Sequence, residues 1–159
     1  RPKTAAALVA FIRSDMETLR RTAGRVALPR RRVVVVLGDL PVPPRPVWVA
    51  APGSFLEALL LAAGQENAAA GAVTISHAEI GLEKLLTLDI EGILTFGEPL
   101  TDRQWDDLYR TWEKVGVIPA IRDRRVGRVG GPEWLSAGPR VAIELHHFIT
   151  ALAEVEGTN

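Results

Sequence analysis

Asp39 is the residue of this sequence best placed to do chemistry. It follows Gly38 at the end of a strand-like stretch, residues 32–38, whose four consecutive valines are typical of a buried parallel strand. Catalytic and ligand-binding groups of α/β proteins commonly lie where such strands end. A carboxylate there could position a water molecule, but a single aspartate after a glycine is more often a turn residue. We therefore assign no catalytic residue and keep Asp39 as the only candidate.

The loop after this strand lacks the composition of a nucleotide-binding loop. Residues 38–46 contain one glycine among four prolines. Phosphate-binding loops bring several backbone amides close to the ligand, and proline has no amide hydrogen to donate. The sequence therefore predicts no nucleotide cofactor, and no other motif in it predicts a cofactor.

Composition excludes several further classes of site. The chain has no cysteine and three histidines, and the histidine spacing fits no recognisable zinc site, so we expect no metal. No apolar run reaches the roughly 18 residues of a membrane span, and no signal peptide pattern is visible. These features predict a cytoplasmic protein without membrane contact.

Arginine clusters are the candidate nucleic-acid contacts. The formal net charge of +0 argues against strong non-specific binding to DNA or RNA. A local basic cluster still fits a phosphate backbone, although it equally fits an ordinary solvated turn. The candidates for weak or indirect DNA contact are Arg122, Arg124, Arg125 and Arg128.

Two apolar stripes are candidate partner-binding surfaces. Their members recur at spacings of one, three or four residues, which places them on one face of a helix. Such a face packs in the core or binds a partner protein. The first stripe, on helix 4–22, contains Leu8, Phe11 and Ile12, and the second, on helix 101–114, contains Trp105, Tyr109 and Trp112.

Short strands that alternate with helices must position these residues. We expect strands at 32–38, 47–50, 72–76, 89–96 and 116–121. We expect helices at 4–22, 54–63, 78–87 and 101–114, and a last helix after Pro132. Ser76 and Glu79 form a capping-box pattern at the start of helix 78–87. The alternation predicts an α/β fold, with three α/β/α layers around a mostly parallel sheet of four to five strands. Residues 1–30 then form an N-terminal amphipathic helix with a basic turn, and 31–159 the α/β domain.

The order of these pieces resembles the uracil-DNA glycosylase superfamily over roughly residues 31–154. The resemblance is carried by Val-Val-Leu-Gly-Asp-Leu-Pro, Val-Thr-Ile-Ser, Ile-Leu-Thr-Phe-Gly-Glu-Pro and Val-Ile-Pro-Ala-Ile-Arg-Asp. Asp39-Leu40-Pro41 and Glu98-Pro99-Leu100 make the chain most similar to the non-catalytic psi subunits of bacterial DNA polymerase III holoenzyme. The catalytic loops of that superfamily are largely missing here, since the 119–123 loop has no histidine.

The resemblance implies a non-catalytic protein-interaction subunit in a DNA replication or repair assembly, a pseudoenzyme whose partner is another protein subunit. Two alternatives stay open. One is a glycosylase-like enzyme that acts on a flipped base, with Asp39 positioning water. The other is an α/β domain that binds a small molecule at the carboxyl ends of its strands.

Overall fold

The structure is a computed structural model, which describes residues 28–38, 45–73, 77–96, 100–114, 118–129 and 141–157. It also describes residues 6, 7, 9, 10, 13, 14, 17, 18 and 21. The strands are β1 (Arg32–Val36), β2 (Val47–Ala50), β3 (Glu66–Asn67), β4 (His77–Ile80), β5 (Gly92–Thr95) and β6 (Val126–Arg128). The helices are α2 (Phe55–Ala62), α3 (Leu82–Leu86), α4 (Asp102–Glu113), α5 (Pro119–Arg122) and α6 (Val141–Val155).

The valine strand β1 lies at the centre of a mixed sheet. The strand order is β4-β2-β1-β5-β6, with β3 paired to the start of β1. β5 and β3 run parallel to β1 and β6 runs parallel to β5, whereas β2 is antiparallel to both β1 and β4. The predicted α/β class is confirmed, but the sheet has six strands and mixed directions among the described residues.

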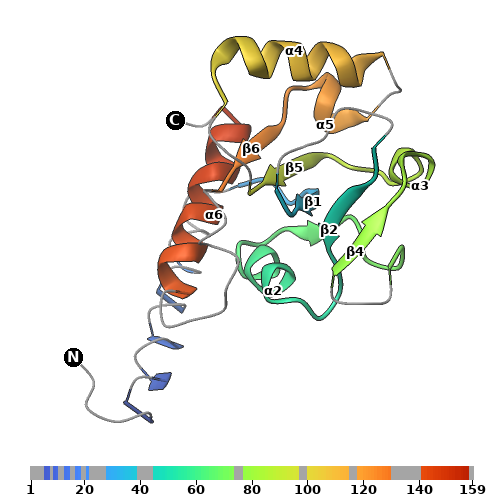
Figure 1. Cartoon of the computed structure of the whole chain (residues 1–159). Helices are drawn as coiled ribbons and strands as arrows, with labels where there is room; N and C mark the ends of the chain where they lie inside the picture. The colour runs from blue at the N-terminus through green and yellow to red at the C-terminus, as the bar shows by residue number, and fades with distance from the viewer. Residues whose placement is uncertain are drawn as a thin grey trace.

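Helices cover both faces of this sheet because successive valines of β1 point to opposite sides. Val33 and Val35 belong to one apolar core with residues of α2 and α6, such as Leu59 and Phe148. Val34 and Val36 belong to a second core with α3, α4 and α5. Figure 1 shows the same arrangement, with α4 and α5 on one side of the strands and α2 on the other.

The starts of α2 and α4 follow from local sequence. Ser54 caps α2, since its hydroxyl accepts a hydrogen bond from the amide of Glu57, at 3.1 Å. Thr101 and Gln104 form a capping box at the start of α4. The helices predicted at 54–63 and 101–114 are confirmed. The strands predicted at 32–38, 47–50 and 89–96 are confirmed in their central residues.

Residues 77–80 form a strand where we predicted the start of a helix. Ala78 and Ile80 are buried while Glu79 is exposed, which is the two-residue alternation of a strand. The segment pairs with β2, with Glu79 opposite Trp48, and α3 begins only after Gly81. The capping-box interpretation is therefore wrong, because Glu79 lies within a strand. The last residues of the predicted strand 72–76 lie outside the described residues.

The strand predicted at 116–121 is also wrong in its described part. Pro119 begins the short helix α5, where its missing amide hydrogen and fixed φ are tolerated. Ala120 and Ile121 are buried in this helix, which explains the apolar pattern that suggested a strand. The strand next to β5 is instead β6, whose Gly127 lies against α6.

The described residues between 6 and 21 are helical and exposed, and in Figure 1 they extend away from the α/β body at the lower left. Leu8, Phe11 and Ile12 lie outside the described residues. The boundary at 30/31 stays a prediction. No helix in the described part of the chain has the length and apolar character to span a membrane.

Candidate functional site

The parallel strands β1, β5 and β6 end together at one edge of the sheet. The amide of Phe96 donates to the carbonyl oxygen of Gly38 at 3.2 Å, and the amide of Val129 donates to that of Thr95 at 2.9 Å. Gly38, just after β1, adopts a φ of +103°, a backbone conformation that favours glycine. Ligands of α/β proteins bind at this edge, called here the carboxyl edge. Asp39 follows immediately but lies outside the described residues, so its role stays a prediction.

Trp48 is an exposed aromatic residue at the carboxyl edge. The amide of Leu37 donates to its carbonyl oxygen at 2.8 Å, which places Trp48 opposite the last residue before Gly38. Its strand neighbours Val47 and Val49 are buried in the core of α3, α4 and α5, so the Trp48 side chain points to the other face. It is 51% exposed there. Arg45 precedes β2, is also exposed, and forms no ion pair with a described residue.

The sequence reasoning did not include Trp48 or Arg45 among the site residues. The available signal was the alternation of Val47, Trp48 and Val49 beside a valine strand, which places the tryptophan on the face opposite the two valines. Its exposure depends on how far α2 and α6 cover that face, which no local pattern gives.

A buried amide holds the segment between β2 and α2. Asn67 donates to the carbonyl oxygen of Ala50 at 3.3 Å and to a Glu57 carboxylate oxygen at 3.0 Å, and it accepts from the amide of Ala69 at 2.9 Å. The other Glu57 oxygen accepts from the amide of Gly53 at 2.7 Å. The polar groups of Asn67 and Glu57 are therefore occupied by hydrogen bonds within the domain. These bonds hold the chain in place around β2.

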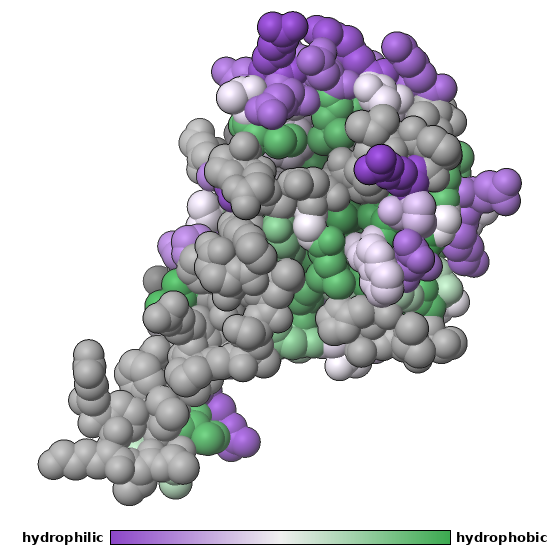
Figure 2. Space-filling model, in the orientation of Figure 1, coloured by the Kyte–Doolittle hydropathy of each residue, from purple (hydrophilic) through white to green (hydrophobic). Residues whose placement is uncertain are grey.

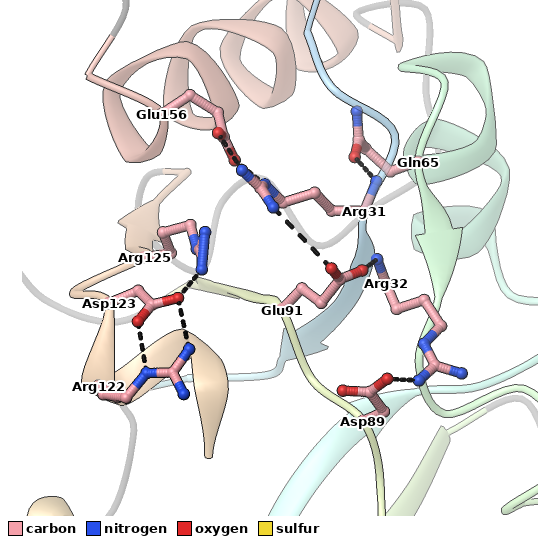
Figure 3. A network of polar contacts seen from close by, with 9 residues as sticks. All are labelled: Arg31, Arg32, Gln65, Asp89, Glu91, Arg122, Asp123, Arg125 and Glu156. Atoms are coloured by element: carbon pink, nitrogen blue, oxygen red, sulfur yellow. Dashed lines mark hydrogen bonds and ion pairs between the residues drawn. The ribbon is translucent and has the colours of Figure 1, made fainter. Parts of the chain in front are cut away.

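The opposite, amino edge of the sheet carries a network of ion pairs (Figure 3). Arg31 holds the Glu156 carboxylate with two nitrogens, one of them at 2.7 Å, and this pair raises the pKa of the Arg31 guanidinium. The backbone amide of Arg31 donates to Gln65 at 2.9 Å. Arg32 pairs with Asp89, and its amide donates to Glu91 at 2.9 Å. The network ties the start of β1 to the end of α6 and to the turn before β5.

A small cavity lies beside this network. It measures about 10 Å³, which is room for one water molecule at most. Its lining includes Leu28, Arg31, Gln65, Gly92 and Glu156. This cavity is therefore too small to hold an organic ligand.

Three of the predicted nucleic-acid contacts are paired with carboxylates of the chain. Arg122 and Arg125 both bind Asp123, and Arg124 lies 3.1 Å from a carboxylate oxygen of Asp106. Arg128 ends β6, at the carboxyl edge, and so lies apart from the other three. Their part in nucleic-acid binding stays a prediction.

The predicted aromatic stripe of α4 packs largely against the domain itself. Trp112 is 1% exposed and Tyr109 is 7% exposed, whereas Trp105 is half-buried and stacks on Tyr109 with ring centroids 5.9 Å apart. The Arg124 guanidinium lies 5.0 Å from the Tyr109 ring centroid. Burial raises the pKa of the Tyr109 phenol, and the positive charge of Arg124 partly opposes this shift. The partner-binding role of these aromatics stays a prediction.

The outer surface over α4 is hydrophilic, as Figure 2 shows at the top of the view. Exposed charged residues of both signs, including Asp102, Arg103 and Asp107, account for it. Within the described residues, no group of three or more His, Asp or Glu side chains is placed to hold a metal ion.

Comparisons with known proteins identify the fold. No family model and no curated protein sequence matches the chain. Among solved structures, the periplasmic heme-binding protein BhuT in complex with two hemes matches with a TM-score of 0.70 and 21% identity, over 94% of this chain and 55% of that one. A possible iron-binding periplasmic protein from Staphylococcus epidermidis gives a TM-score of 0.72 at 15% identity, over 93% and 54%. An ABC-type Fe3+-hydroxamate transport protein from Saccharomonospora viridis gives 0.68 at 17% identity, over 96% and 49%.

These matches correct the function expected from the sequence. The resemblance to uracil-DNA glycosylases and to polymerase III psi subunits is wrong, and with it the replication or repair role and the pseudoenzyme interpretation. The predicted partners, another protein subunit with weak or indirect DNA contact and no membrane, are contradicted by neighbours described as heme-binding or ABC-transport proteins. The expectation of no metal stays a prediction. The cytoplasmic location is contradicted by neighbours described as periplasmic. The chain has the fold of periplasmic binding proteins and spans about half the length of the solved structures it matches.

Proposed function

We propose that the chain forms one ligand-binding lobe of a solute-binding protein that serves an ABC transporter. The observation that carries this proposal is the match to BhuT, which covers nearly the whole of this chain but 55% of that protein. Coverage of nearly all of this chain but only about half of BhuT is expected when the chain corresponds to one lobe and its linking segment. On this proposal the protein works in the periplasm or outside the cell.

The two edges of the sheet support a ligand site at the carboxyl edge. At the amino edge the basic side chains Arg31 and Arg32 are paired with carboxylates, and the neighbouring cavity has room for one water molecule. At the carboxyl edge Trp48 and Arg45 are exposed beside the end of β1 and the start of β2. Ligand sites combine apolar or aromatic surface with a few polar groups that orient the ligand. The carboxyl edge offers that combination.

A ligand titration tests the proposal. The purified chain is titrated with hemin and, separately, with ferrioxamine B, a ferric hydroxamate, and binding is followed by thermal stabilisation and native mass spectrometry. A ligand that binds the folded state raises its stability in proportion to RT ln(1 + [L]/Kd). We expect one ligand per chain and a rise in Tm with at least one of the two. If neither ligand binds the folded chain, the proposed function is wrong.

A further inference from the structure

We infer that the ligand is a planar conjugated ring system that carries a carboxylate, with Trp48 stacking on the ring and Arg45 binding the carboxylate. The inference rests on the proposed function, because it assigns the ligand class of the same carboxyl edge. It favours a heme-like molecule over a ferric hydroxamate of the ferrioxamine type, which has no aromatic ring.

The first step is the unusual exposure of Trp48. Its neighbours Val47 and Val49 are at most 1% exposed, whereas Trp48 is 51% exposed. Four large hydrophobic side chains of the described residues are exposed, and Trp48 is the aromatic one; the others are Val9, Leu61 and Ile143. Half of a large aromatic surface left in water beside a rigid strand suggests contact with something outside the domain.

The second step is the rigidity of the platform that presents Trp48. Its carbonyl oxygen accepts from Leu37, and it lies opposite Glu79 on β4, so strands flank it on both sides. Leu37, just after β1, is the cross-strand neighbour of Trp48, so the two side chains point to the same face of the sheet. On that face Leu37 packs against the core of α2 and α6. A flat ring presented from a fixed strand binds another flat ring with little loss of conformational entropy.

The third step is the charge near this platform. Arg45 is three residues before Trp48, so their backbones are at most about 11 Å apart. Arg45 is exposed and forms no ion pair with a described residue, in contrast to Arg30, Arg31 and Arg32 at the amino edge. A guanidinium binds a carboxylate through two parallel hydrogen bonds. One planar ligand with a carboxylate arm can contact both side chains.

Variants of Trp48 and Arg45, with control variants on α4, test the inference with hemin and with hemin dimethyl ester, which lacks free carboxylates. Hemin binding is followed by its own absorbance, so the readout does not depend on the protein's tryptophans. Trp48→Ala should weaken hemin binding about tenfold or more, while Trp48→Phe keeps most of it. Trp105→Phe, a change at a half-buried tryptophan on α4, is the matched control and should leave binding unchanged.

Arg45→Gln should weaken binding of hemin severalfold but leave binding of the dimethyl ester unchanged. Arg103→Gln, at an exposed arginine of α4 without an ion pair to a described residue, is its control. Circular dichroism checks that each variant is folded. Hemin binding that is unaffected by Trp48→Ala and Arg45→Gln would overturn the inference. If ferrioxamine B binds and hemin does not, the inference fails while the proposed function stands; if neither binds, both fail.

Discussion

Among the described glycines, Gly127 is the one at which an added methyl group would meet the closest neighbours. A β-carbon there would lie 2.6 Å from Val155 Cγ2, 3.0 Å from the backbone oxygen of Ala151 and 3.1 Å from Leu94 Cδ2. Two of these neighbours belong to α6 and one to β5, so relief requires movement of a packed helix and not of one flexible side chain. Gly127→Ala therefore tests whether α6 lies as close to β6 as the structure shows.

The expected size of the effect follows from two opposing contributions. Forcing a methyl group into a close-packed site costs about 1–3 kcal/mol. Replacing glycine also reduces the entropy of the unfolded chain, which restores about 0.4–1 kcal/mol. We expect a net loss of about 1–2 kcal/mol, or a fall in Tm of roughly 2–8 °C for a domain of this size.

Urea unfolding followed by circular dichroism measures this loss. Gly81→Ser is the matched control, because a β-carbon at Gly81 meets nothing within 4 Å and serine is a good residue for the N-cap of α3. The double variant Gly127→Ala/Val155→Ala should recover part of the loss, since it removes the side chain that the new methyl group meets. Equal or greater stability of Gly127→Ala than of the unchanged chain would refute the packing of α6 described here.

Two further predictions concern charged and polar groups. Glu156→Gln should lower the free energy of unfolding by about 1–3 kcal/mol, because the Arg31–Glu156 pair is only 23% and 12% exposed. Glu66→Gln, which breaks the exposed pair with Arg30, should cost no more than about 0.5 kcal/mol in the same urea titration, and equal losses would contradict the burial of the first pair. The phenol of Tyr109, the one tyrosine of the chain, should titrate above the ordinary pKa of 10.0 in its ultraviolet absorbance. Because the folded state then binds the proton more tightly than the unfolded state, stability should fall as pH rises above about 10, and a normal or lowered pKa would argue against burial of this ring.

Local sequence was sufficient for the elements that carry their own signals. The run from Val33 to Val36 gave the central strand, and Ser54 and Thr101 gave the starts of two helices. Residues 77–80 were mistaken for a helix because Ser76 and Glu79 match a capping box, whereas pairing with β2 decides their conformation. The mixed direction of the sheet also depends on long-range pairing, which no local pattern contains.

The candidate site was less predictable than the fold. The resemblance to glycosylases relied on triplets such as Asp39-Leu40-Pro41, which are too short to carry information about how strands are ordered. An alternation of strands and helices is shared by many unrelated α/β proteins, so it could not distinguish between them. Trp112 and Tyr109 are buried and Trp48 is exposed for the same reason: neighbouring helices decide which side chains are covered, and sequence spacing does not.

Hydrogen exchange with and without hemin tests the central claim most directly, because it locates the ligand on the sheet. We predict that hemin slows exchange at residues 36–38 and 45–50, at the carboxyl edge, and leaves residues 28–32, 89–91 and 153–157 at the amino edge unchanged. Protection confined to the amino edge would contradict a ligand site at the carboxyl edge. So would exchange that neither hemin nor ferrioxamine B changes.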